Sequence, residues 1–356
     1  MKFELSEEQE LLQETIRGFL EAECSLTRLR EIYDNDEPFD PALWKGMCEL
    51  GLAGIQIPEE YGGAGLAALD LAVVAESLGY GAAPGPFLGH SLAAAAITLG
   101  GSEAQRERWL PALASGDSLG TVAFAEDAGW QPEDWTLPSG AKLSGSKRHV
   151  LYGDVADVIV VGTAGGGLAV VEGGTGVSAE TFGGADCTRR LVELTFDSAS
   201  AEPLAGGAEA AVRVRDLALV LLAADAFGGA ARCVELAVDY AKNREQFGVT
   251  IGHFQALKHQ LANLAVDVEP SRALYWYAGH AYDEQPEESA RTAALAKAHL
   301  TERFMQAARD TVEVHGGYGF TWECEVQVWF KRAMFDRAYL GTPAVHRERA
   351  AVLADW

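Results

Sequence analysis

The chain has 356 residues, of which 52 are acidic and 28 basic, so its formal charge is −24 at pH 7. This excess of negative charge repels phosphate backbones and anionic lipid surfaces, which argues against nucleic acid and membranes as partners. With 48% hydrophobic residues the chain is not of the disordered class, and it is long enough for two or three domains with sizeable cores.

The cysteines give no sign of a disulfide framework or a metal site. They are odd in number, scattered and without ligand spacing such as Cys-x-x-Cys: Cys24, Cys48, Cys187, Cys233 and Cys324. The sequence opens without a charged segment and apolar core of the signal-peptide kind, and its long apolar runs are interrupted before about 20 residues. We therefore expect a cytoplasmic protein with reduced thiols and no membrane span.

The first predicted region, residues 1–118, is a helical domain. Ser6 and Gln9 have the spacing of a capping box at a helix start. Apolar residues then recur at helical spacing and form one face: Leu11, Leu12, Ile16, Phe19 and Leu20. Turn sequences at 58–63 and 83–86 divide the region into several helices.

The second predicted region, residues 119–207, is a small β domain. Short β-branched runs occupy 158–161 and 191–196, and glycines interrupt the sequence at 165–167 and 173–174. This texture is typical of short strands joined by tight loops. We expect a barrel-like sheet.

The third predicted region, residues 208–356, is helical again. Alanine- and leucine-rich stretches cover 208–243, 255–283 and 287–314 with few breakers. Antiparallel helices of this length predict a four-helix bundle with a face available for self-association or for a partner. The fold class is therefore α+β and multidomain, with helical, β and helical domains in that order.

One group of residues in the last region suits a large, phosphate-bearing cofactor. Arg244 offers a planar donor fork for a pyrophosphate, Phe247 an aromatic face, and Gln255 an amide for a heterocycle edge or a phosphate. Gly316 and Gly317 allow backbone to approach a bulky ligand closely.

The domain order and several motifs in matching positions resemble the FAD-dependent acyl-CoA dehydrogenase family over nearly the whole chain. The motifs are residues 50–55, 58–65, 243–248, 254–255 and 315–320. The resemblance implies the acyl-CoA dehydrogenase fold, an acyl-CoA substrate and an electron-transfer flavoprotein as electron acceptor. It also implies contacts to the adenine-dinucleotide half of a neighbouring subunit's FAD, by Arg244, Gln246, Phe247, Gln255, Gly316 and Gly317.

The sequence departs from this family at the catalytic base. The family motif Tyr-Glu-Gly-Thr reads Tyr339-Leu340-Gly341-Thr342 here, and leucine cannot accept a proton. In some branches the glutamate lies instead on the helix before the Arg-x-x-Phe-Gly motif, a position that falls at Ala218. A displaced base stays open, and Asp225, which shares a predicted helix with Asp216 and Ala218, is the first candidate.

Two histidines, His315 and His346, are further candidates for the base. A histidine beside paired glycines is more often structural or adjacent to the cofactor. The sequence alone therefore assigns no catalytic residue.

The contacts that the family makes with the flavin ring are also changed. The usual threonine of Thr-Glu-Pro is Ala125, and the tryptophan and threonine of Trp-Ile-Thr are His149 and Leu151. A further departure is Glu313, where the family often has glutamine. The dinucleotide motifs are thus kept while the ring contacts and the base are not.

This pattern favours the non-catalytic subunit type of the bacterial α2β2 acyl-CoA dehydrogenases. Two alternatives remain: a self-sufficient flavoenzyme, alone or as a homo-oligomer, with a relocated base, and a non-enzymatic binding or scaffolding relative. Steroid, branched and fatty acyl groups all remain open as substrates.

Overall fold

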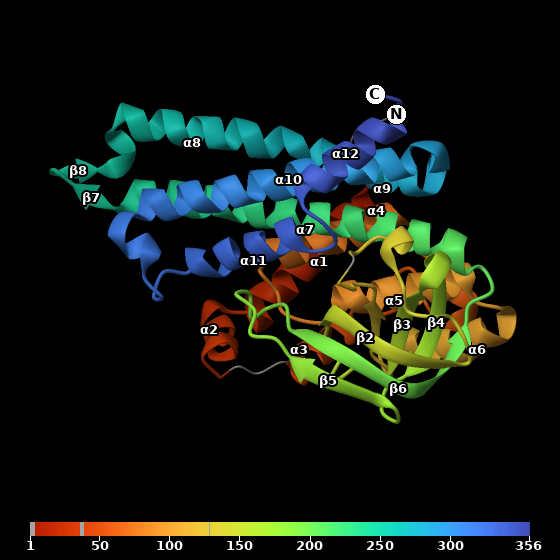
Figure 1. Ribbon diagram of the computed structural model, residues 1–356. Helices are drawn as coiled ribbons and strands as arrows, with labels where there is room; N and C mark the ends of the chain where they lie inside the picture. Colours follow the sequence, from red (N-terminus) through yellow and green to blue (C-terminus); the bar gives the residue numbers. More distant parts are fainter. Residues whose placement is uncertain (1–3, 36–38, 128) are drawn as a thin grey trace. The chain divides into compact units, whose positions relative to one another are not determined.

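The computed structural model describes residues 4–35, 39–127 and 129–356 (Figure 1). The chain divides into two compact units. A mixed unit holds residues 31–71 and 84–218, and a helical unit holds residues 1–30, 72–83 and 219–356. The elements follow the predicted order, with helices up to Ser115, strands from Gly120 to Pro203 and helices from Gly207 onward.

The helices of the mixed unit are α3 (Pro41–Glu49), α5 (Phe87–Gly100) and α6 (Glu103–Ser115). The Asp40 carboxylate caps α3 by accepting from the backbone N–H groups of Ala42 and Leu43, and Pro41 occupies the first turn, where no N–H is needed. Helix α6 begins with a capping box and ends at Gly116, whose φ of 79° suits glycine.

Six strands form the sheet of this unit: β1 (Gly120–Ala123), β2 (Lys142–Leu151), β3 (Val158–Thr163), β4 (Gly167–Glu172), β5 (Val177–Thr181) and β6 (Leu191–Pro203). The order is β1-β3-β4-β6-β2, with β5 also paired to β6, and β1 and β3 are parallel while the other pairs are antiparallel. A bridge between Ala125, just after β1, and Arg148 in β2 brings the first and last strands of that order together. The sheet is therefore curled almost into a barrel, as predicted.

The helical unit takes its first helices from the N-terminal part of the chain. These are α1 (Glu7–Glu23) and parts of α2 (Leu26–Asn35) and α4 (Ala68–Tyr80). The predicted capping box is present, since Ser6 Oγ accepts from Gln9 N and Gln9 Oε1 accepts from Ser6 N. On the predicted apolar face Ile16 and Leu20 are buried and Leu12 and Phe19 are half-buried, whereas Leu11 is exposed.

The remaining helices of this unit are α7 (Gly207–Asn243, shared with the mixed unit), α8 (Gln255–Val268), α9 (Arg272–Glu284), α10 (Pro286–His315), α11 (Val326–Ala338) and α12 (Pro343–Leu353). Helix α10 packs against α8, α9, α11 and α12. The stretch 255–283 forms two helices, because a short turn containing Pro270 separates α8 from α9.

Within the helical unit, α4 crosses α7 at backbone contact distance. A Cβ at Gly79 would lie 2.0 Å from the carbonyl oxygen of Asp225, and one at Gly228 would lie 1.9 Å from that of Glu76. Only glycine fits at these two positions. The crossing therefore ties the N-terminal segment 72–83 to the C-terminal helices.

Among the described residues α7 is the one helix long and apolar enough to cross a membrane. In its most apolar window 94% of the residues are buried inside the protein, as in the core helix of a globular fold.

A fully buried histidine links four segments of the mixed unit. The Nδ1 of His90 in α5 accepts from Gly120 N (3.1 Å), so the proton is on Nε2, which lies 3.2 Å from Ala53 O and 3.1 Å from Leu113 O. Burial lowers the pKa of His90 from its ordinary 6.5 to about 4. Protonation of Nδ1 would abolish the bond from Gly120, so the folded chain keeps this ring neutral.

We expect His90 to make stability fall as the pH falls. The unfolded chain binds a proton at this ring below pH 6.5 and the folded chain only below about pH 4, so stability is lost across that window. Between pH 7 and pH 5 the loss from this residue is about 2 kcal/mol.

Urea unfolding of His90→Gln and of the unchanged chain at both pH values measures this contribution. The difference in unfolding free energy between the unchanged chain and His90→Gln should be smaller at pH 5 than at pH 7 by about 2 kcal/mol. The matched control is the exposed His259→Gln, which should keep a constant gap. A constant gap for His90→Gln as well would contradict the assignment.

Candidate functional site

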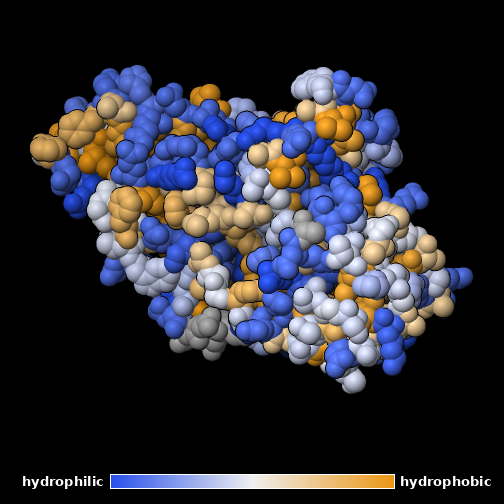
Figure 2. Space-filling view, viewed as in Figure 1, coloured by the Kyte–Doolittle hydropathy of each residue, from blue (hydrophilic) through white to orange (hydrophobic). Residues whose placement is uncertain are grey.

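A hairpin at one end of the helical unit carries three of the predicted cofactor contacts. Helix α7 ends at Asn243, and β7 (Glu245–Gln246) pairs with β8 (Val249–Thr250) (Figure 1). At the turn Phe247 has a φ of 55° and is 93% exposed, 6.1 Å from the ring of Phe254. This end of the molecule shows apolar surface in Figure 2.

The polar residues predicted to contact the cofactor lie on backbone that hydrogen bonds hold in place. The N–H of Arg244 donates to Tyr240 O and its carbonyl accepts from Ile251 N, both at 2.8 Å, while its side chain is exposed. Gln255 is the exposed first residue of α8. The amide of Gln246 donates to Glu245 O at 2.7 Å. Arg244 and Gln255 are therefore presented to solvent, whereas Gln246 is partly used within the hairpin.

The paired glycines lie at the same end of the unit. His315 ends α10, and its ring stacks on Tyr240, one turn before Arg244, at a centroid distance of 4.1 Å. Gly316 has a φ of 61°, which favours glycine, and a Cβ at either Gly316 or Gly317 would meet no atom within 4 Å. The space over both is thus open, as a ligand contact requires.

This open end also carries aromatic surface. Phe320 is 76% exposed, and Tyr318 and Trp322 are each 47% exposed. Exposed aromatic side chains are typical of surfaces that another molecule covers.

Two buried side chains hold the loop at Leu340, where the sequence resemblance predicts the family's base. Leu340 is buried with a φ of 57°, and His346 Nε2 lies 3.1 Å from its carbonyl oxygen. The Nζ of Lys297, in the middle of α10, donates to Gly341 O and, at 3.2 Å, to Arg337 O. Burial lowers the pKa of Lys297 to about 7.

Sequence reasoning missed Lys297. The available signal was a lysine within the apolar stretch 293–300 of a predicted helix, where a charge needs a buried partner. The second base position, Ala218, is fully buried on α7 and carries no polar group.

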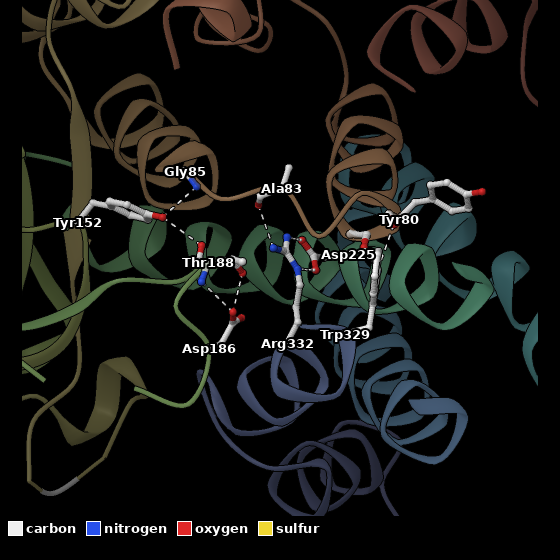
Figure 3. Close-up of polar contacts among 10 residues, drawn as sticks. Tyr80, Ala83, Gly85, Tyr152, Asp186, Thr188, Asp225, Trp329 and Arg332 are labelled. Atoms are coloured by element: carbon white, nitrogen blue, oxygen red, sulfur yellow. Dashed lines mark hydrogen bonds and ion pairs between the residues drawn. The ribbon is translucent and has the colours of Figure 1, made fainter. Parts of the chain in front are cut away.

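Asp225, the candidate for a displaced base, forms a buried ion pair with Arg332 of α11 (Figure 3). Arg332 Nε donates to Asp225 Oδ1 at 2.8 Å and Nη2 donates to Oδ2 at 2.5 Å, while Nη1 donates to Ala83 O at 2.9 Å. Arg332 is fully buried and Asp225 is 4% exposed. A carboxylate held on both oxygens by a guanidinium is a poor proton acceptor, so its role here is structural.

The other candidates are also engaged. Asp216 is buried and accepts from the neighbouring Arg215 Nε at 3.2 Å. His315 Nδ1 lies 2.8 Å from Thr311 O, and burial lowers the pKa of His315. His346 is fully buried against the Leu340 carbonyl.

In the mixed unit, packed side chains occupy the positions at which the sequence resemblance predicts flavin contacts. His149 has a φ of 54° and stacks between Trp130 (5.4 Å) and Phe182 (5.3 Å). Ala125 and Leu151 are each 2% exposed. A residue later, the Tyr152 hydroxyl donates to Thr188 O at 3.0 Å and accepts from Gly85 N at 2.9 Å (Figure 3). These contacts hold the C-terminal end of β2 in place through side chains of the protein itself.

A second buried lysine explains the acidic residue of the changed Thr-Glu-Pro motif. Lys147 Nζ lies 2.5 Å from Glu126 Oε1, and Glu126 also accepts from the N–H groups of Thr136 and Leu137. Burial lowers the pKa of Lys147 to about 8, although Glu126 opposes that shift. The glutamate therefore orders a loop.

No group of His, Cys, Asp or Glu within the described ranges could hold a metal ion.

The chain is similar to known proteins in family pattern, in sequence and in structure. The family described as Acyl-CoA dehydrogenase, N-terminal domain, matches residues 6–117, and Acyl-CoA dehydrogenase, C-terminal domain, matches residues 206–352. Acyl-CoA dehydrogenase IpdE2 of Mycolicibacterium smegmatis is 36% identical over 340 residues, covering 95% of this chain and 96% of the relative.

Two solved structures are similar over nearly the full chain. A chain of the ChsE4-ChsE5 complex from Mycobacterium tuberculosis has a TM-score of 0.90 and 27% identity, covering 100% of this chain and 99% of that chain. A chain of the Tcur3481-Tcur3483 steroid ACAD G363A variant has a TM-score of 0.90 and 29% identity, with 98% of each chain covered.

We expect Asp225→Asn to destabilise the helical unit by about 3–5 kcal/mol, because it leaves the Arg332 guanidinium buried without its counter-charge. Thermal or urea unfolding measures the loss. Asp239→Asn, at an exposed position on the same helix, is the matched control and should change stability little. An Asp225 variant as stable as this control would reopen a catalytic role for the carboxylate.

Proposed function

The chain belongs to the acyl-CoA dehydrogenase family, and from that premise we propose that it is the non-catalytic subunit of a heteromeric acyl-CoA dehydrogenase. Family members are FAD-dependent oxidoreductases that act on CH–CH groups of acyl-CoA thioesters, and FAD supplies the hydride acceptor when bound. The proposed complex removes hydrogen from the α and β carbons of an acyl-CoA and passes electrons to an electron-transfer flavoprotein.

The observation that carries the proposal is the absence of a carboxylate at either base position. α-Proton abstraction from a thioester needs a positioned base. Leu340 and Ala218 are both buried and aliphatic. Asp225, the first candidate for a displaced base on the helix of Ala218, is bound on both oxygens by Arg332.

The residues present fit one part of FAD and not another. At the hairpin end, the exposed guanidinium of Arg244, the ring of Phe247 and the amide of Gln255 are available to a pyrophosphate and an adenine. In the mixed unit His149, at one of the positions expected to contact the chain's own flavin ring, packs instead against Trp130 and Phe182. This difference supports a role toward a neighbour's cofactor.

The relatives support a two-component assembly. Both similar solved structures are named for pairs of proteins, ChsE4-ChsE5 and Tcur3481-Tcur3483, and the second is called a steroid ACAD. In the proposed complex a homologous base-bearing subunit pairs with this chain in an α2β2 arrangement. A bulky acyl group of the steroid kind is the substrate class that the second of these relatives favours.

The proposal predicts that the purified chain alone carries little FAD and that flavin appears when a base-bearing partner is co-expressed. The measurement is visible flavin absorbance per chain, with and without the partner. The partner to test is an acyl-CoA dehydrogenase that carries the glutamate and is encoded beside this chain. A chain that holds stoichiometric flavin alone and is bleached anaerobically by an acyl-CoA would overturn the proposal in favour of a relocated base.

Arg244→Ala should weaken FAD binding by the assembled complex about ten- to a hundredfold, the range expected for losing a charge-assisted hydrogen bond to a phosphate. Flavin retained after gel filtration and equilibrium titration of the stripped complex measure it. Arg291→Ala is the control: it lies near the start of α10, the helix whose far end carries His315. Equal occupancy in the two variants would remove Arg244 from the site.

A further inference from the structure

The helical unit also contains a cavity of about 200 Å³ that none of the family-motif residues lines. It is formed by α1, the start of α2, the end of α4, α7 and α11. Cys24 and Leu29 are buried on its wall, whereas Glu21 and Ser25 are exposed and mark its mouth.

This cavity lies apart from the proposed cofactor contacts and from the base loop. Arg232, which lines it, lies on α7 twelve residues before Arg244, the residue that follows the helix, or about 18 Å along the axis. Trp329 precedes Leu340 by eleven residues, most of them in α11. A ligand in the cavity would therefore touch neither site.

The cavity wall combines cations with aromatic rings. The guanidinium carbon of Arg17 lies 4.6 Å from the centroid of the Tyr80 ring, and that of Arg232 lies 5.5 Å from the same ring and 5.7 Å from the Trp329 ring. Trp329 Nε1 donates to Tyr80 O at 3.1 Å, and the Tyr80 hydroxyl donates to Glu235. The rings are thus held in place by polar contacts.

The two arginines of the cavity wall each form an ion pair, and one N–H group of Arg17 has no acceptor among the described residues. Arg17 Nη2 pairs with Glu76 at 3.1 Å, and Arg232 Nη1 pairs with Glu235 at 3.4 Å. The Nε–H of Arg17 is shielded from water and meets no acceptor in the described part of the chain. Glu21 is exposed, so water screens its charge. Because water does not reach the Nε–H of Arg17, a ligand oxygen would meet the accessible part of the Arg17 guanidinium, whose side chain is 32% exposed.

We propose that this cavity binds a small aromatic carboxylic acid of the benzoate class. A cavity of about 150 Å³ holds benzene, so about 200 Å³ holds one six-membered ring with a carboxylate. The ring packs on Tyr80 and on the leucine side chains of the wall, Leu20, Leu26 and Leu29, and the carboxylate accepts from Arg17. This inference does not depend on the proposed function, because it needs neither FAD nor a partner.

The test is titration of the purified chain with benzoate, without FAD or CoA, by calorimetry and by saturation-transfer NMR. For a ligand of this size a Kd of about 0.1 to 1 mM is expected. Benzamide, which has the same shape without the charge, should bind at least about fivefold more weakly. Equal binding of the two would overturn the role of the guanidinium.

Two variants separate the cavity from the surface. Arg17→Gln should weaken benzoate binding at least about tenfold, because it removes the charged donor. Leu26→Trp should abolish binding by filling the cavity, and it leaves every polar contact of Arg17 in place. The control is the exposed Arg309→Gln on α10, which should bind as the unchanged chain does.

The outcomes are decisive for a chain that folds, which the unfolding midpoint of each variant checks. Loss of binding in both cavity variants, with the control unchanged, supports the site. Absence of benzoate binding at 10 mM (about ten times the weakest expected Kd) would overturn the proposal. So would equal affinity in the unchanged chain and in Leu26→Trp, since binding would then lie elsewhere on the surface.

Discussion

The helical unit depends on the place where α4 crosses α7. Gly79 and Gly228 let the two backbones meet with no side chain between them, and the buried pair of Asp225 and Arg332 joins α7 to α11 at the same level. Arg332 also donates to Ala83 O, just beyond α4. One N-terminal segment is thereby locked among C-terminal helices by shape and by charge. Asp225 is therefore a poor candidate for a displaced base, because both oxygens of its carboxylate already bind Arg332 at the crossing.

The sequence predicted most of the architecture because its pattern changes where the structure changes. Helical spacing gave way to β-branched runs at about residue 119 and returned at about 208, close to the observed ends of α6 and start of α7. The capping box at Ser6 was confirmed. The break at Pro270 was missed, since alanine- and leucine-rich sequence on both sides hid a single proline turn. The family and the fold class are confirmed by the matched domains and solved structures.

Much of the candidate site could not be read from the sequence, because its meaning depends on long-range partners. Arg244, Phe247 and Gln255 carried a local motif and were predicted, and their role toward FAD stays a prediction. The sequence did not identify Lys297 or Lys147, because a buried lysine is explained only by its partner in the fold. For Lys297 that partner is a backbone carbonyl 40 residues away in sequence. For Lys147 it is the carboxylate of Glu126. The stack of Trp130, His149 and Phe182 joins three separate segments and has no local signature.

The loop at Leu340 shows how buried side chains can impose a backbone conformation that the local sequence does not favour. A leucine gains nothing locally from a φ of 57°, a conformation that glycine or asparagine adopts more readily. The conformation is instead imposed from outside, by Lys297 on the Gly341 carbonyl and by His346 on the Leu340 carbonyl. Burial disfavours the charged form of Lys297 and lowers its pKa. The hydrogen bonds from its ammonium group to the carbonyls of Arg337 and Gly341 offset part of this cost and order the loop. The buried side chains of Lys297 and His346 thus fix the backbone of this loop from two sides, although its own sequence does not favour the conformation.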